Sequence, residues 1–416
     1  MSQAKANAPV SEPKLPRRDW ILLPLIALLT ILLIMAPTEW IARRAFTGSS
    51  DELERCHTFR DPVSGIGRVS NCVYWVKAFE AQPTQYRMNS SGYRSDVEFG
   101  AKSPGTFRIV LVGSSVGLGA STQRENTFAA LLPEELSKRT GRPVELYNES
   151  IPGIPGLPQS VALRFKDVLA TKPDLVLWEV GRWDIKETLT PLPAKDEPTE
   201  QRASSGAAWL RVKEDIAKHD THRTVSDLMS LGRGFLDSMK GVFHDSRTAF
   251  MLQHFLYQSP SIYVRYFLSG PDEFAGYLKA VPSAAWRARL QAFDADVASV
   301  QAQAAAAGVP LAVVTIPSFP QADMISMGEW PAGSDPYMLD DELRSIVVNH
   351  GATYIDIFPG FRTISNPAQY FLPVDGHPNA GGHAIISRLL ADDLSRGAVP
   401  ALKSTLSPQN VLKGTR

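Results

Sequence analysis

Short runs of apolar residues alternate with longer amphipathic stretches from residue 106 onward. Apolar β-branched runs indicate buried strands and helical periodicity indicates intervening helices, so the pattern predicts a parallel sheet with helices on both faces. The predicted strands are residues 107–112, 144–148, 175–180, 311–316 and 353–357. The predicted helices are residues 127–139, 157–170, 284–307, 340–349 and 382–396. The expected fold class is therefore α/β, a three-layer domain over residues 106–396, followed by a C-terminal tail at 397–416.

One segment interrupts this alternation, because about 100 residues (186–282) separate the third predicted strand from the next helix. A connection of this length is not a bare loop. Apolar residues recur at helical spacing between Val225 and Phe243, and aromatic residues are frequent from Phe250 to Tyr277. We therefore predict a helical insertion, which either packs on the sheet as a subdomain or forms a lid over a site or a surface facing lipid.

A second departure lies near the N-terminus, where residues 20–36, from Trp20 to Ala36, contain no charged side chain. A bilayer core requires about 20 apolar residues, with about 17 as the lower limit. The run therefore predicts a transmembrane helix at 20–38, preceded by a tail at 1–19 and followed by a juxtamembrane segment at 39–105. A cleaved signal peptide and a buried helix are the alternatives, but no small-x-small cleavage site occurs before Arg43.

The charges that flank this run indicate an orientation. Four basic residues precede it, whereas Arg43 and Arg44 after it are followed by Asp51, Glu52 and Glu54. The positive-inside rule favours a cytoplasmic tail. The expected location is thus the cell inner membrane, with the domain on the periplasmic or extracellular side.

Composition excludes several classes of protein. The 416 residues carry 43 Lys+Arg against 43 Asp+Glu and are 44% hydrophobic. This balance argues against disorder and against nucleic acid as a partner. Two cysteines are too few for a cysteine zinc site, and His219, His222, His244 and His254 have no carboxylates at metal-ligand spacing. We predict neither a metal ion nor a cofactor.

Cys56 and Cys72 are 16 residues apart, just after the predicted membrane span. In an oxidising compartment they are expected to form a disulfide. In a cytoplasmic domain the two thiols would stay reduced, as small buried side chains.

A glycine-rich turn, Gly113-Ser-Ser-Val-Gly-Leu-Gly119, follows the first predicted strand. It lacks the terminal Lys of a phosphate-binding loop and the spacing of a dinucleotide fingerprint. It does match G-x-S-x-G, the nucleophile elbow of α/β-hydrolases, in which the acid and the histidine come from separate late loops.

An acid stands two residues before a histidine near the end of the chain, at Asp375 and His377. By itself this pair is typical of a polar turn before a helix. Together with Ser115, however, it predicts a catalytic triad: Ser115 attacks an ester carbonyl, His377 takes and returns the proton, and Asp375 orients His377.

These motifs resemble those of the SGNH, or GDSL-type, hydrolases, a family with a flavodoxin-like three-layer fold. The first block is matched by Gly113, Ser115 and Gly119, with Ser114 at the usual Asp. Residues 148–153 (NESIPG) are similar to the second block, and the resemblance implies that the Ser115 and Gly153 N–H groups bind the oxyanion. The third block, residues 181–184 (GRWD), has Trp183 at the position of the usual Asn.

The remaining segments extend the resemblance over residues 86–396, apart from the insertion. The Asp-x-His spacing at Asp375, followed by Pro378 and Asn379, is similar to the alginate-acetylation branch of the family. Residues 89–94 (NSSGYR) are similar to a segment that often precedes the domain in bacterial members. Trp183 either donates its indole N–H to the oxyanion or walls off an apolar pocket.

The resulting function is that of a membrane-anchored serine esterase acting on acyl, including acetyl, esters of an envelope polysaccharide or glycolipid. Two alternatives remain. The first is an O-acyltransferase that works beside a membrane partner supplying the acyl group. The second is a catalytically weak domain that binds glycans or scaffolds a complex, because the usual Asn is missing.

Overall fold

The computed structural model describes residues 19–47, 56–58, 67–95, 97–151, 157–186 and 246–404. Two compact units are present, residues 1–46 with 227–252 and residues 47–226 with 253–416. The predicted helical region from Val225 to Phe243, the predicted oxyanion donor Gly153 and most of both predicted tails lie outside the described residues.

A five-stranded parallel sheet forms the centre of the second unit, in the order β6-β5-β7-β8-β9. Numbered along the chain this order is 2-1-3-4-5, which is that of flavodoxin-like folds. The strands are β5 (Phe107–Val112), β6 (Val144–Asn148), β7 (Leu175–Val180), β8 (Leu311–Thr315) and β9 (Thr353–Ile355). The expectation of an α/β domain around a parallel sheet is confirmed.

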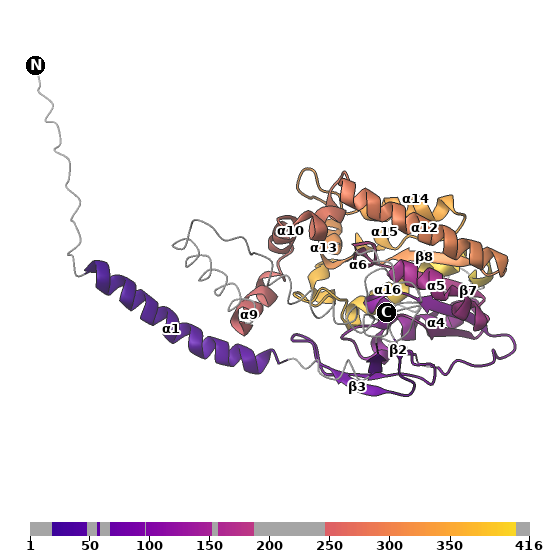
Figure 1. Cartoon of the computed structure of the whole chain (residues 1–416), viewed down its shortest axis with the longest axis horizontal. Helices are drawn as coiled ribbons and strands as arrows, with labels where there is room; N and C mark the ends of the chain where they lie inside the picture. The colour runs from indigo at the N-terminus through magenta and orange to yellow at the C-terminus, as the bar shows by residue number, and fades with distance from the viewer. Residues whose placement is uncertain are drawn as a thin grey trace, which may run out of the picture. The chain divides into compact units, whose positions relative to one another are not determined.

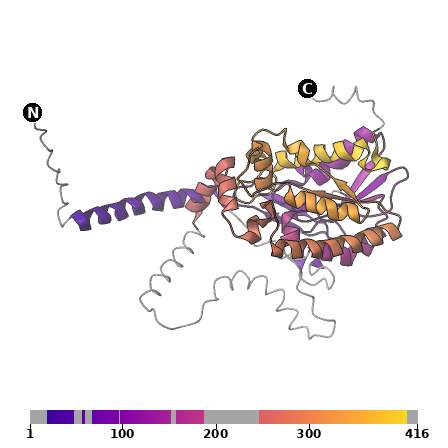
Figure 2. The same ribbon diagram turned by 90° about the horizontal axis from the view of Figure 1, so that it is seen from above.

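Helices cover both faces of this sheet (Figures 1 and 2). Alternate residues of β5 point to opposite sides, so that Ile109 and Leu111 join one core while Val110 and Val112 join the other. The first core contains α4 (Phe128–Thr140) and α16 (Ala380–Asp393). The second contains α5 (Leu157–Ala170), α12 (Ala284–Ala306) and α14 (Met338–Asn349). Figure 2 shows the yellow α16 and the orange α12 on opposite sides of the strands.

The last strand is shorter than the predicted 353–357. Its pairing with β8 ends at Ile355, opposite Val314. The Asp356 side chain then accepts a hydrogen bond from the Phe358 N–H, which turns the chain into the short helix α15 (Phe358–Phe361). The polar side chain therefore ends the strand two residues early.

Several elements were not predicted from the sequence. Helix α13 (Phe319–Met327) begins at a capping box, in which Ser318 and Gln321 satisfy each other's backbone N–H groups. Most of α13 is buried, so it lacks the one-sided apolar pattern that marks a surface helix. The others are β1 (His57–Thr58), β2 (Gly67–Arg68), β3 (Val73–Val76), β4 (Thr84–Arg87), α3 (Ser115–Leu118), η1 (Arg124–Asn126), α6 (Arg182–Lys186), η3 (Pro367–Tyr370) and η5 (Pro400–Leu402). The predicted helix at 382–396 covers most of α16 and the start of η4 (Leu394–Ala398).

The described end of the insertion is helical. It contains α9 (Arg247–Leu256), α10 (Pro260–Leu268), α11 (Asp272–Ala275) and η2 (Gly276–Leu278). Tyr263 stacks on Phe319 of α13 with ring centroids 4.2 Å apart, and Tyr277 is fully buried. Phe255 and Tyr266, by contrast, remain 61% and 55% exposed. The aromatic residues therefore divide between core packing and the surface.

In the other unit, the helix α1 (Asp19–Ala45) contains the predicted span and continues seven residues beyond its predicted end at 38. The Glu39 carboxylate accepts hydrogen bonds from the Arg247 and Thr248 N–H groups and the Ser246 hydroxyl, and so caps the start of α9. Among the described residues, no helix has both the length and the apolar character to cross a bilayer. The membrane span therefore stays a prediction from the sequence.

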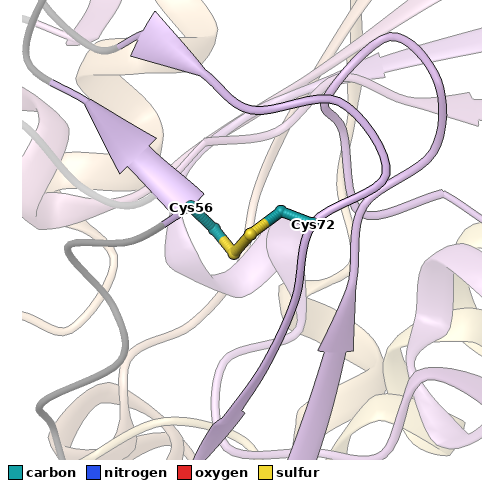
Figure 3. The surroundings of a disulfide bond; sticks show 2 residues. All are labelled: Cys56 and Cys72. Carbon is teal, nitrogen blue, oxygen red and sulfur yellow. A yellow bond between two sulfur atoms is a disulfide. The ribbon is translucent and has the colours of Figure 1, made fainter.

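A disulfide joins Cys56 to Cys72 beside the small antiparallel strands that precede the central sheet in the chain (Figure 3). Their Cα atoms are 5.6 Å apart, and Cys56 is fully buried beside Tyr74 and Tyr86. The bridge thus closes a 16-residue stretch of chain next to a small aromatic core.

The double variant Cys56→Ser/Cys72→Ser should lose about 3 kcal/mol of unfolding free energy, because an open 16-residue loop has more freedom in the unfolded chain. Denaturant unfolding of the full-length protein measures this loss. Alkylation of unreduced protein, followed by mass spectrometry, should find no free thiol. Two alkylated cysteines, or unchanged stability in the double variant, would contradict the prediction.

Candidate active site

Ser115 lies at the carboxyl end of β5, where the chain turns directly into the short helix α3. Gly113 is required before this turn, since a Cβ there would come within 2.5 Å of the Glu179 Oε2 atom. Gly119 ends α3 in the left-handed conformation, with φ of 78°. The glycines of the motif therefore permit a tight strand-to-helix turn with Ser115 at its start.

The histidine and the acid come from the loop before α16. His377 Nε2 lies 2.7 Å from the Ser115 Oγ atom, although the two residues are 262 positions apart. On the other side of the ring, His377 Nδ1 is hydrogen-bonded to Asp375 Oδ1. The structure thus brings the three predicted triad residues together in the order serine, histidine, acid.

Three side chains from other parts of the fold hold the nucleophile turn. Glu179 Oε2, at the end of β7, accepts hydrogen bonds from the Ser114 and Gly117 N–H groups at 2.8 and 3.2 Å. The Asn148 amide donates to the Gly117 carbonyl at 2.9 Å. Buried Arg94 donates to the Leu118, Gly119 and Thr122 carbonyls.

These contacts give a structural role to two segments that the sequence analysis singled out. Asn148 begins the second block, and Arg94 ends the NSSGYR segment. Both donate to backbone carbonyls around the serine turn, so both fix its backbone.

The charges of the triad favour an imidazole that binds protons readily. Burial lowers the pKa of His377, and the positive charge of Arg182 also lowers it. The hydrogen bond to Asp375 and the negative charges of Asp375 and Glu179 outweigh both effects, so the pKa of His377 lies above its ordinary value. Burial alone raises the pKa of Asp375, yet the hydrogen bonds and charge of His377 leave that pKa below its ordinary value. Asp375 therefore stays ionised and stabilises the protonated form of His377.

A pair of buried carboxyl groups lies beneath the serine turn. Burial raises the pKa of Glu179, although hydrogen bonds from the Ser114 and Gly117 N–H groups and the charge of His377 act to lower it. Burial and the charge of Glu179 raise the pKa of Asp184 well above its ordinary value. Asp184 also accepts the Gly181 N–H at 2.6 Å. Because two buried like charges repel, an ionised Glu179 disfavours ionisation of Asp184.

Glu179 is a functional residue that the sequence analysis missed. It is the one charged residue of β7, Leu-Val-Leu-Trp-Glu-Val, whose six residues are all buried. An isolated acid in a buried apolar strand is rarely tolerated without a role, and this was the available signal. Assigning that role required the spatial closeness of β5.

Trp183, at the position of the usual Asn, lies on α6 and is 46% exposed. Its ring makes an edge contact with Phe274 at 5.8 Å between centroids. The Arg182 guanidinium lies 4.0 Å from the centre of the same ring. The Trp183 ring therefore packs in a small cluster with Phe274 and Arg182.

His383, on α16, belongs to the core. It is fully buried, burial lowers its pKa to about 3, and its Nδ1 accepts the Phe128 N–H at 3.3 Å. In the described part of the chain, no three His, Cys, Asp or Glu side chains lie close enough together to hold a metal ion.

The similarities found between this chain and known proteins are all similarities to solved structures. No protein-family model and no curated protein matches the chain. It is similar to LAE5, an alpha/beta hydrolase enzyme from the metagenome of Lake Arreo, Spain (16% identity, 72% of this chain and 97% of that one, TM-score 0.37). It is also similar to Axe2, an acetylxylan esterase from Geobacillus stearothermophilus (14% identity, 70% of this chain and 96% of that one, TM-score 0.35). A third likeness is to a putative lipolytic protein of the G-D-S-L family from Desulfitobacterium hafniense (14% identity, 68% of this chain and 99% of that one, TM-score 0.31). Identities and scores of this size leave the function to be inferred from the site.

Proposed function

We propose that this protein is a serine ester hydrolase of the SGNH type that works through an acyl-enzyme. The observation that carries the proposal is the continuous hydrogen-bonded chain from Ser115 Oγ through His377 to Asp375. In this arrangement the serine hydroxyl donates to Nε2, while the Nδ1–H is donated to the carboxylate.

In the proposed first half-reaction, Ser115 Oγ attacks the ester carbonyl and its proton moves to His377 Nε2. The protonated imidazole is stabilised by Asp375, and Nε2 then gives the proton to the departing alcohol oxygen. The N–H groups of Ser115 and Gly153 are the proposed donors to the tetrahedral oxyanion. The product of this half is an acyl-Ser115 and a free alcohol.

The second half repeats these steps with a new acceptor. A water molecule loses its proton to His377 Nε2 and attacks the acyl carbon, and Ser115 leaves with the proton returned from Nε2. With water the protein is an esterase, whereas a sugar hydroxyl in its place would make it an acyltransferase. The ratio of free acid to acylated sugar formed from one acyl donor separates the two outcomes.

The proposed setting is the outer side of the cell inner membrane, in the periplasm or beyond. Residues 20–36 would anchor the chain, and the proposed substrate is an acylated glycan or glycolipid of the envelope, related to alginate-type acetyl esters. The Cys56–Cys72 disulfide supports a compartment outside the cytoplasm, since structural disulfides persist in oxidising compartments.

A fluorophosphonate probe should label the full-length protein at Ser115, because a serine hydrogen-bonded to a histidine is an activated nucleophile. Ser115→Ala should abolish labelling and reduce kcat for a small acetyl ester by about 10⁴-fold or more. Ser114→Ala, which alters the adjacent hydroxyl, should retain labelling. Labelling that persists in Ser115→Ala would refute the nucleophile. An unlabelled wild type would favour the glycan-binding alternative.

The pH dependence of kcat/KM should report His377. As a general base His377 must be neutral, so activity should rise with pH, with a midpoint above the ordinary histidine value of 6.5. Glu179→Gln removes a negative charge that raises the pKa of His377, so the midpoint should move to lower pH. The side-chain amide oxygen in this variant can still accept the Ser114 N–H. An unchanged or higher midpoint would contradict the predicted electrostatic effect.

Trp183→Phe should keep kcat within a few-fold of wild type, since phenylalanine preserves an aromatic face toward Phe274. If the indole N–H were an oxyanion donor, its loss would lower kcat by about 10²–10³-fold. Steady-state kinetics on a small acetyl ester distinguish the two roles. A comparable loss in Trp183→Phe, partly recovered in Trp183→Asn, would establish the donor role.

A further inference from the structure

A buried carboxylate outside the triad contacts the loop that carries the catalytic acid. Glu80 lies between β3 and β4, and its side chain is 1% exposed. Its Oε1 atom accepts the backbone N–H groups of Val374 at 2.8 Å and of Asp375 at 3.0 Å. Glu80 thus holds the residue whose own carboxylate orients His377.

The loop that Glu80 contacts is already closed at its base. The Leu372 N–H donates to the His377 carbonyl at 2.9 Å, and the Gly376 N–H donates to the Leu372 carbonyl at 2.7 Å. The Val374 and Asp375 N–H groups at the tip instead point to Glu80. Hydrogen bonds to an ionised acceptor are about twice as strong as neutral ones, so one carboxylate can fix both peptide groups.

The second carboxylate oxygen of Glu80 contacts the helical insertion. Glu80 Oε2 lies 2.9 Å from the Nδ1 atom of His254, near the end of α9. The His254 side chain is 22% exposed. A Nδ1–H donated to Oε2 leaves Oε1 turned toward the loop, so the imidazole orients the carboxylate. The helical insertion therefore contacts Glu80, which in turn contacts the loop of Asp375.

We propose that Glu80, held by His254, is a positioning residue that sets the backbone of Asp375 and through it the alignment of His377 with Ser115. The inference rests on the proposed esterase function for its kinetic consequences. It also assigns the described end of the insertion a task other than covering the site, because α9 supplies His254.

The test compares Glu80→Ala, Glu80→Gln and His254→Ala in the full-length protein. In Glu80→Ala, kcat for a small acetyl ester should fall by about 10- to 100-fold, because small misplacements of catalytic groups are costly. KM should stay within about twofold, since Glu80 lies behind the acid and not in contact with the ester. Glu80→Gln, which keeps an acceptor oxygen, should recover most of kcat, and His254→Ala should show an intermediate loss.

The matched control is Glu98→Ala. Glu98 belongs to the same part of the chain before the sheet and accepts hydrogen bonds from the Ser90 N–H and hydroxyl groups instead of from the loop of Asp375. This variant should leave both kcat and KM at wild-type values. An equal loss of kcat in Glu98→Ala and Glu80→Ala would show a general weakening of the segment and would overturn the positioning role.

Amide hydrogen exchange tests the contact without relying on activity. The Val374 and Asp375 amides should exchange at least about tenfold faster in Glu80→Ala than in wild type or Glu98→Ala, because they lose their acceptor. If Glu80→Ala does not fold, His254→Ala should still show faster exchange at these two amides than Glu98→Ala, while Glu80→Gln, which keeps an acceptor oxygen, should stay closer to wild type. Wild-type exchange in His254→Ala would overturn the proposal.

The two measurements separate this inference from the proposed function. A wild-type protein that neither hydrolyses esters nor reacts with a fluorophosphonate would refute the esterase, while exchange at Val374 and Asp375 would still judge the contact. An active wild type whose kcat is unchanged in Glu80→Ala would refute the positioning role alone.

Discussion

All five strands of the central sheet run in the same direction, and the candidate site follows from this constraint. Parallel strands place their carboxyl ends along one edge, so the turns that leave β5, β6 and β7 meet there. Ser115, Asn148 and Glu179 come from these three strand ends. Asn148 and Glu179 both form hydrogen bonds with the backbone of the turn that carries Ser115. The loop before α16 then adds His377 and Asp375 to the same edge.

Buried negative charge is the main electrostatic feature of this edge. Glu179 is fully buried, which is costly unless N–H donors and positive charge compensate for the lost water. The Ser114 and Gly117 N–H groups and the nearby His377 supply part of that compensation, and burial still leaves the pKa of Glu179 raised. The same carboxylate raises the pKa of His377, so one residue both shapes the serine turn and favours proton uptake by the imidazole.

A layer of supporting contacts lies behind the reacting groups. Arg94 fixes the far end of the serine turn, and Glu80 fixes the tip of the acid loop. Both residues precede the sheet domain in the chain, within the segment that the disulfide also braces. The part of the chain between α1 and the sheet is thus part of the site's support, and not merely a spacer.

The sequence by itself determined the sheet, the serine and the Asp-x-His pair. Buried parallel strands are continuous apolar runs, and the predicted bounds of β5, β6 and β7 agree with the structure to the residue. Glycine spacing identified the turn at Ser115 because backbone sterics are local. Glu80, Glu179 and the surroundings of Trp183 were decided by the tertiary structure alone. Their distant partners Gly117, Asp375 and Phe274 lie between 62 and 295 residues away, and no local pattern records a contact made at such a distance.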